Sequence, residues 1–321
     1  MAQMTQNKAR PVNVIFMGSP EFAVPSLENL LSDASFDVKC VFTMPDRPRG
    51  RGQKETMTPV KQLALKAGIP IHAPQSFRKE PGLVELIEGY APNLLVVVAY
   101  GHILPAPILE IPTMGAINLH ASLLPRHRGP SPIHFALLSG DAVTGNTVML
   151  MNSRMDEGDV LAVDSLAIAS EDTYLTLHDR LARSGAVLLN NTLKSYIKGD
   201  LSSVPQDHSK ATYTTKITPD LARINWTKSA PELLQTIRAF SPAPGAWFEF
   251  KNERFKIGNA RLGPQFAEAP GKIIFSDPKI GLRIKCGENT TIDILSLQRP
   301  GKSLLPISDF LRGFRFDQDL V

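Results

Sequence analysis

The chain has 321 residues, 43% of them hydrophobic and 21% charged, which is the length and composition of an ordinary globular protein with two domains. It contains no run of about eighteen apolar residues and begins with a polar stretch, so we expect neither a membrane span nor a secretion signal. Cys40 and Cys286 are its only cysteines, which argues against a disulfide scaffold and favours a reducing, cytoplasmic compartment.

The first part of the chain alternates predicted strands and helices. Residues 12–17 and 38–43 are apolar and rich in β-formers, and a helical pattern lies between them. Residues 94–99 form a continuous apolar run, which is typical of a strand covered on both faces. This order predicts a doubly wound α/β domain with a parallel sheet. The turn G-S-P-E-F after the first strand has too few glycines for a dinucleotide fingerprint, so we do not expect NAD binding.

A basic segment, M-P-D-R-P-R-G-R-G-Q-K, follows the second predicted strand. Its prolines and glycines predict a loop outside helix and sheet, and its four cations are Arg47, Arg49, Arg51 and Lys54. So many cations in so few positions are well suited to contact phosphate groups. An ordinary solvated loop is the alternative.

The central stretch, residues 115–132, reads G-A-I-N-L-H-A-S-L-L-P-R-H-R-G-P-S-P. Asn118 and His120 are two residues apart on a predicted strand, so both should project from the same face at its end. The prolines and glycine that follow predict a rigid loop, which is a usual place for chemistry in an open α/β sheet. A lone histidine at a strand end is more often structural, so its functional interpretation depends on its neighbours.

A second candidate lies after the predicted strand 146–151, where the chain reads N-S-R-M-D-E-G-D. Asp156, Glu157 and Asp159 suggest a metal loop, but the segment is too short for the regular ligand spacing that calcium and magnesium loops need. We therefore expect no metal. A carboxylate on this loop could instead orient the imidazole of His120.

The last third of the chain has a different pattern. A long predicted helix over 173–198 is followed by a polar, proline-marked linker. Short alternating runs separated by turn residues then predict a small antiparallel barrel, which carries Lys251, Arg254, Lys256, Arg261, Lys272, Arg283 and Lys285. From residue 211 onward there are 16 Lys and Arg against 11 Asp and Glu, whereas residues 1–210 hold 19 against 20. A basic last third favours a polyanionic partner such as nucleic acid, and a solvated surface fits it about as well.

Taken together, these segments resemble the methionyl-tRNA formyltransferases, a family of folate-dependent formyltransferases. The resemblance rests on F-M-G-S-P-E-F, P-D-R-P-R-G-R-G, V-V-V-A-Y-G-H-I-L-P, I-N-L-H-A-S-L-L-P-R-H-R-G-P-S-P-I, M-D-E-G-D-V, R-I-N-W and L-S-L-Q-R-P-G-K, which extend along essentially the whole chain. The N-x-H-x-S-L-L-P element with a later loop aspartate indicates the chemistry, whereas the basic loop and the R-I-N-W and G-K segments indicate tRNA. Two departures are His127, where the family usually has an aromatic residue, and S-R-M-D in place of a glycine-led segment before Asp156.

The resemblance implies a Rossmann-like catalytic domain over residues 1–200, a linker over 201–216 and an OB-like tRNA-binding barrel over 217–321. It implies 10-formyltetrahydrofolate as co-substrate without a metal, initiator methionyl-tRNA as partner, and no obligatory protein partner. The implied catalytic residues are Asn118, His120 and Asp156. The implied folate site consists of Ser122, Leu123, Leu124, Pro125, Tyr100, His102 and Leu104. The implied contacts of the tRNA acceptor end are Arg47, Arg49, Arg51 and Lys54.

Two alternatives are open at this stage. One is a formyltransferase that acts on a small amine, such as a nucleotide sugar or a purine precursor, and it would have no use for the basic loop or the barrel. The other is a non-catalytic RNA-binding protein on a degenerate formyltransferase scaffold. The presence of all three polar residues, Asn118, His120 and Asp156, argues against the second.

Overall fold

The computed structural model describes residues 10–49, 54–77, 79–80 and 82–320. The chain folds into two compact units, each assembled from several segments. The first unit combines Met1–Gly129, Thr144–Leu166 and Asp179–Tyr213, and the second combines Pro130–Val143, Ala167–His178 and Thr214–Val321.

The first unit is built on a seven-stranded sheet in the order β5-β2-β1-β6-β7-β8-β9. Its strands are β1 (Val12–Gly18), β2 (Phe36–Phe42), β5 (Ile71–His72), β6 (Leu94–Val98), β7 (Ala116–His120), β8 (Val143–Leu150) and β9 (Val160–Ala167). The pairs from β5 to β7 are parallel, which confirms the predicted α/β sheet, but β8 runs antiparallel to β7. The prediction of a uniformly parallel sheet was wrong at this strand because an apolar run reports that a strand is buried, not its direction.

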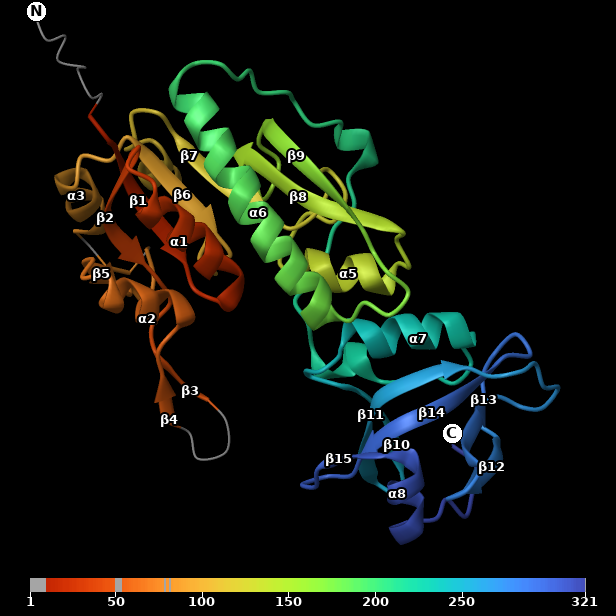
Figure 1. Cartoon of the computed structure of the whole chain (residues 1–321). Coiled ribbons are helices and arrows are strands. Elements are labelled where there is room, and N and C mark those ends of the chain that lie inside the picture. The colour runs from red at the N-terminus through yellow and green to blue at the C-terminus, as the bar shows by residue number, and fades with distance from the viewer. Residues whose placement is uncertain (1–9, 50–53, 78, 81, 321) are drawn as a thin grey trace, which may run out of the picture. The chain divides into compact units, whose positions relative to one another are not determined.

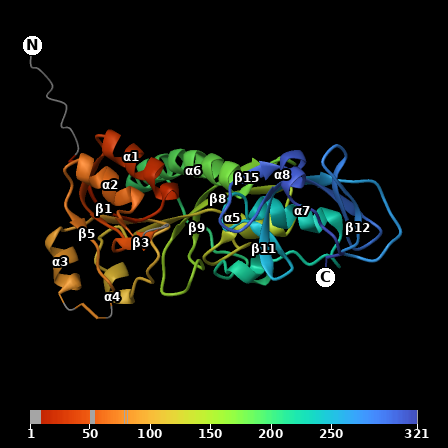
Figure 2. The same cartoon turned by 90° about the horizontal axis from the view of Figure 1, so that it is seen from below.

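Helices cover both faces of this sheet, as a doubly wound sheet requires. Figures 1 and 2 show α1 (Val24–Ser32) and α6 (Tyr174–Ile197) on one face, with α3 (Leu83–Gly89) and α4 (Ala106–Leu109) on the other. Along β1, Ile15 and Met17 are fully buried and pack in a core cluster with Leu83 and Ile87 of α3. The neighbours Val14 and Phe16 are also fully buried, so β1 is covered on both faces. A short 3-10 helix, η1 (Glu21–Ala23), precedes α1, and η2 (His208–Lys210) follows α6.

The basic segment forms a hairpin, with β3 (Arg47–Arg49) antiparallel to β4 (Lys54–Thr56). The prediction that proline and glycine exclude this segment from sheet was therefore wrong. Pro48 is tolerated because this sheet has only two strands, both of them edges, and an edge position does not require every N–H. At the base of the hairpin, Lys61 on α2 (Pro59–Lys66) lies 2.5 Å from the Asp46 carboxylate. Arg51 lies outside the described residues.

The second unit contains an antiparallel sheet in the order β10-β11-β14-β13-β12, with β15 paired to β14. This confirms the predicted antiparallel domain. Among the described residues the pairing ends at β10 and β12, so the predicted closure into an OB-like barrel stays a prediction. The elements are α5 (Pro132–Leu138), η3 (Pro219–Ala222), α7 (Ala230–Ala239), β10 (Ala246–Phe250), β11 (Glu253–Leu262), β12 (Ile273–Asp277), β13 (Gly281–Lys285), β14 (Thr291–Gln298), β15 (Leu304–Pro306) and α8 (Ile307–Gly313).

The core of this unit is an aromatic and aliphatic cluster between the sheet and its helices. Phe248 and Phe255 face each other across β10 and β11 with ring centroids 5.7 Å apart, and Phe310 and Phe316 close the cluster from the C-terminal segment. Lys285, predicted to decorate the surface, is instead 1% exposed, and its ammonium donates to the carbonyl of Cys286. Leu282 and Ile284 alternate into the core cluster, so Lys285 leaves the opposite face of β13, and its burial there does not follow from the strand pattern.

Both cysteines are buried and free, as expected from their separation in the sequence. In the part of the chain that the structure describes, no helix is both long enough and apolar enough to cross a bilayer.

Candidate active site

Asn118 and His120 lie on β7, between β6 and β8 of the first unit. Leu119 pairs with Val98 of β6 on one side and with Val148 of β8 on the other, so β7 is held along its whole length. Because the two polar residues are two positions apart, both side chains leave the same face of the strand. They are 8% and 7% exposed. Within the described residues, the Asn118 amide makes no hydrogen bond to another protein group, so it can serve a ligand.

The imidazole of His120 lies between a carbonyl and a carboxylate. Its Nε2 is 3.0 Å from the backbone carbonyl oxygen of His127, and its Nδ1 is 3.8 Å from Oδ2 of Asp156. A carbonyl oxygen only accepts, so Nε2 must carry a proton. Nδ1 faces the carboxylate at a distance greater than a hydrogen bond. The gap is suited to a water or an amine that exchanges a proton with either group.

The loop that carries Asp156 has an unusual backbone conformation and is fixed by close contacts. Its φ is +55°, which an L-residue adopts only where the surroundings enforce it. The N–H of Gly129 donates to Oδ2 of Asp156 at 2.7 Å. Two residues on, Gly158 passes so close to β8 that a Cβ there would lie 1.7 Å from the carbonyl oxygen of Leu150. The loop is therefore seated tightly against the sheet.

The loop after β7 is fixed by its own hydrogen bonds. The Oγ of Ser122 donates to the Arg126 carbonyl at 2.6 Å, and Thr147 of β8 bonds both the Ser122 carbonyl at 2.7 Å and the Leu124 N–H at 3.1 Å. Ser122 is fully buried, whereas Leu123, Leu124 and Pro125 are partly exposed. The exposed part of this predicted folate segment thus consists of apolar side chains.

The other predicted folate residues follow β6. Tyr100 and Leu104 are 3% and 5% exposed and belong to the core cluster, while His102 is partly exposed with its Nε2 3.1 Å from the Pro74 carbonyl. The hydroxyl of Tyr100 is buried without a hydrogen-bond partner among the described residues. Burial, and then the charge of Glu80, raise the pKa of Tyr100 well above its usual value.

Sequence reasoning missed two residues that support the site, Arg128 and Gln206. The guanidinium of Arg128 is fully buried and donates to the Gln206 side-chain oxygen through Nε at 3.1 Å and through a terminal nitrogen at 2.7 Å. The Gln206 amide in turn donates to the carbonyls of Asp156 and Gly158. Gln206 lies within the segment predicted as a linker, and the polar composition of that segment gave no indication of a residue that supports the site. Arg128 stands next to Gly129 in the central stretch, which is the one cue that could have drawn attention to it.

The predicted nucleic-acid contacts are only partly visible. Arg47 is exposed on β3, Arg49 and Lys54 are the last and first residues of β3 and β4, and Arg51 is not described. In the second unit most predicted basic residues pair with acids: Lys251 with Asp317, Lys272 with Glu268, and both Arg261 and Arg283 with Asp293. Arg254 instead lies over the ring of Trp247, with its guanidinium carbon 4.1 Å from the ring centroid, and Arg223 lies over the same ring at 5.5 Å.

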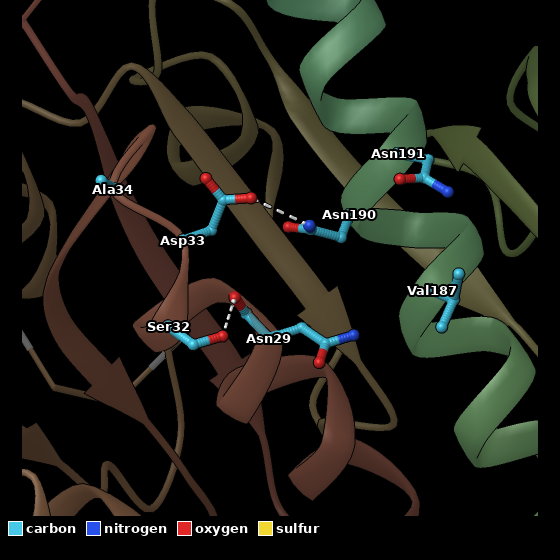
Figure 3. A pocket seen from close by; sticks show the side chains of 7 residues that line it. All are labelled: Asn29, Ser32, Asp33, Ala34, Val187, Asn190 and Asn191. Atoms are coloured by element: carbon cyan, nitrogen blue, oxygen red, sulfur yellow. Dashed lines mark hydrogen bonds between the residues drawn. The ribbon is translucent and has the colours of Figure 1, made fainter.

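A polar cavity of about 330 Å³ lies elsewhere in the first unit, between the end of α1 and α6 (Figure 3). It is at the edge where β2 begins, whereas His120 is at the edge where β7 ends, so it is not part of the site above. Asp33 in this cavity accepts from Asn190 at 3.0 Å and pairs with Lys194 at 2.5 Å. Burial alone would raise the pKa of Asp33, but these partners and Ser35 hold it well below its usual value.

The described residues include no cluster of three side chains of the kinds that bind metals.

Comparison with known proteins finds matches along nearly the whole chain. The family described as formyl transferase matches residues 11–193, and the formyl transferase C-terminal domain matches residues 216–315. A methionyl-tRNA formyltransferase from Clostridium novyi (strain NT) is 40% identical over 303 residues, which cover 94% of this chain and 97% of that protein. The chain belongs to the methionyl-tRNA formyltransferase family. A family member from Caldanaerobacter subterraneus subsp. tengcongensis is likewise 40% identical, over 97% of this chain and 99% of its own.

Solved structures share the fold at low identity. WlaRD, a sugar 3N-formyltransferase studied with dTDP and 5-N-formyl-THF, has a TM-score of 0.66 at 18% identity and covers 92% of this chain and 100% of its own. HypX from Aquifex aeolicus, studied with tetrahydrofolic acid, has a TM-score of 0.61 at 16% identity. The match covers 94% of this chain but only 47% of HypX, so this chain spans about half of that protein. These structures show the shared fold, whereas the two family models and the curated relatives confirm the expected family and, with it, the expectation of an enzyme.

Proposed function

We propose that this protein transfers the formyl group of 10-formyltetrahydrofolate to the α-amino group of methionine on initiator tRNA, giving formylmethionyl-tRNA for translation initiation. The observation that carries this proposal is the approach of His120 and Asp156 to 3.8 Å at the end of a buried strand. Relatives named for this activity match nearly the whole chain at 40% identity. The charge balance of the last third supports an RNA substrate.

The first step is attack by the neutral amine of methionine on the formyl carbon. The formyl oxygen becomes negative, and donors already in place lower the barrier most. The Asn118 side chain is suited to this role because it projects from the same face of β7 as His120 and makes no described bond that it would have to break. Removing one such donor typically lowers turnover by about 100- to 1,000-fold.

The second step moves a proton. The attacking amine must lose a proton, and the departing folate nitrogen must gain one, so the reaction consumes no proton overall. The pair of His120 Nδ1 and Asp156 Oδ2 can take the proton and return it to the leaving nitrogen, because the Nε2 proton is committed to His127. The Asp156 carboxylate keeps the imidazole orientation and balances its positive charge while it is protonated. No covalent intermediate with the protein is needed.

The folate would lie where the segments after β6 and β7 meet. The two strands are paired, Val98 with Leu119, so the segments leave the sheet side by side. We place the pterin against Leu123, Leu124 and Pro125, with Ser122, Tyr100, His102 and Leu104 behind and beside it. WlaRD and HypX, which share this fold, were each studied with a folate. Folate binding is the part of the proposal that these two neighbours support.

The tRNA would contact the basic hairpin and the second unit. We assign the acceptor end to Arg47, Arg49, Arg51 and Lys54, and the rest of the tRNA to an OB-like sheet over residues 217–321. Register shifts in β11 near Asn259 bend that strand in the way a barrel needs. Arg223 and Arg254 are exposed, and their guanidinium groups lie over the ring of the buried Trp247, so they form an edge suited to phosphates. In this view residues 1–200 are the catalytic domain and 201–216 connect it to the tRNA-binding domain.

The proposal is tested by an assay of formyl transfer with charged initiator tRNA, charged elongator methionine tRNA and a small aminosugar nucleotide as acceptors. Formylation of the initiator tRNA, with 10-formyltetrahydrofolate as donor, is expected. Formylation of the aminosugar alone would refute the proposal and favour the small-amine alternative. Arg254→Ala should raise the KM for tRNA and reduce the salt dependence of binding while kcat stays unchanged.

A further inference from the structure

We propose that Gln206 is a positioning residue of this site, which holds the Asp156 carboxylate in place and is itself oriented by the buried guanidinium of Arg128. This inference deepens the proposed function and depends on it for its kinetic consequence. Its structural consequence can be measured without any substrate.

Gln206 holds the loop that carries Asp156 through two hydrogen bonds. The Nε2 of Gln206 donates to the carbonyl of Asp156 at 2.9 Å and to the carbonyl of Gly158 at 2.7 Å. One side-chain amide therefore fixes the backbone on both sides of Glu157. It does so at the place where Asp156 has a φ of +55° and Gly158 touches β8. A strained loop of this kind keeps its shape only while its surroundings enforce it.

Arg128 determines which way the Gln206 amide points. A guanidinium can only donate, and two of its nitrogens bond the same Gln206 oxygen, at 3.1 and 2.7 Å. The amide nitrogen must then face the loop, where both partners are carbonyls that can only accept. The orientation of the amide is thus required from both sides. Gln206 is 7% exposed and Arg128 is fully buried, so water offers little competition for these bonds.

Arg128 is tied into the same loop by charge. Its other terminal nitrogen is 3.6 Å from the Glu157 carboxylate and 3.3 Å from the Tyr213 hydroxyl, and a bridge joins residue 128 to Tyr213. The Nδ1 of His208 lies 3.1 Å from the terminal Arg128 nitrogen that also bonds Gln206. Arg128 immediately precedes Gly129, whose N–H donates to Asp156 Oδ2. The network therefore reaches the carboxylate by two routes, through the loop backbone and through Gly129.

The decisive variant is Gln206→Glu. It keeps the length and the bond to Arg128, which becomes an ion pair, but it replaces the amide donor by an oxygen that faces two carbonyl oxygens. We expect a folded protein whose melting temperature falls by only a few degrees, because two carbonyls lose their donor, with a kcat lowered about 10- to 100-fold and KM values within about 3-fold. Gln62→Glu is the matched control, because that amide also donates to a backbone carbonyl, at 3.4 Å from Met57, but is exposed on α2. It should leave kcat unchanged.

The substrate-free measurement is the amide of Gly129 in full-length protein labelled with ¹⁵N-glycine. If Gln206 positions Asp156, Gln206→Glu moves the Asp156 carboxylate away from the Gly129 N–H, which donates to it. The Gly129 amide resonance then shifts, and its hydrogen exchange speeds up about 10-fold or more. An unchanged Gly129 amide, or a changed one with wild-type kcat, overturns the proposal. If wild-type protein forms no formylmethionyl-tRNA, the proposed function fails, and the Gly129 amide alone decides whether Gln206 positions Asp156.

Discussion

The substitution Gly158→Ala tests how closely activity depends on the seating of the Asp156 loop. The added Cβ would lie 1.7 Å from the Leu150 carbonyl oxygen, whereas a Cβ atom in a protein essentially never approaches another heavy atom closer than 3.0 Å, so loop and strand must separate by at least about 1.3 Å. Leu150 is the last residue of β8, which is held by β7, so the loop is the part that moves.

A displacement of this size should reach the catalytic pair, because the Gln206 amide links the carbonyls of Gly158 and Asp156. A misplacement of about 1 Å can lower turnover about 100-fold, which corresponds to about 2.7 kcal/mol of transition-state stabilisation. We therefore expect Gly158→Ala to lower kcat by about that factor, with a smaller effect on the KM for folate.

The assay is steady-state formyl transfer together with a thermal melt. The matched control is Gly89→Ala, since a Cβ there meets nothing within 4 Å and the residue ends α3. It should leave kcat and the melting temperature nearly unchanged. A folded Gly158→Ala protein with kcat within about 3-fold of wild type would refute the reasoning, because it would mean that the loop position does not limit catalysis.

Three further predictions concern stability. Burial, and then the charge of His178, lower the pKa of His134 to about 4, so the native state keeps the imidazole neutral while the unfolded chain takes up a proton near pH 6.5. The free energy of unfolding should therefore fall by about 2 kcal/mol as the pH drops from about 6.5 to 4. In urea titrations, His134→Phe should flatten this pH dependence. Tyr100→Phe removes a buried hydroxyl without a described partner and should be neutral or stabilise by about 1 kcal/mol, so a clear loss in the melting temperature would contradict the assignment. Thr58→Ala removes the cap of α2 and the hydrogen bond to the Thr43 hydroxyl at 2.6 Å, so it should lower the free energy of unfolding in urea by about 1–2 kcal/mol. An unchanged urea midpoint would show that the cap contributes nothing.

Local regularities in the sequence predicted the framework. The spacing of Asn118 and His120 placed both side chains on one face of a strand, because side chains alternate along any strand whatever the tertiary fold. The apolar run at 94–99 predicted a strand covered on both faces, and Leu94–Val98 is fully or nearly fully buried. Such features depend on a few neighbouring residues, so the sequence reports them directly.

Other features depend on contacts distant in sequence, and the sequence could not supply them. The loop aspartate was identified as a candidate partner of His120, but its distance follows from how β7, β8 and the loop pack together. Gln206 looked like an ordinary polar residue of a linker because its partners, Arg128 and the Asp156 loop, are 78 and 50 residues away. The hairpin at Arg47–Thr56 was mistaken for a loop because turn-forming residues hide short edge strands.

The central claim is that His120 and Asp156 act as one proton-transferring unit. The most direct test is a double-mutant cycle of His120→Ala and Asp156→Ala, with kcat for formyl transfer to initiator methionyl-tRNA measured for each protein. If the two residues act together, the double variant should be no slower than the slower single variant, within about 3-fold. If the two losses multiply, His120 and Asp156 contribute independently and do not form one proton-transferring unit.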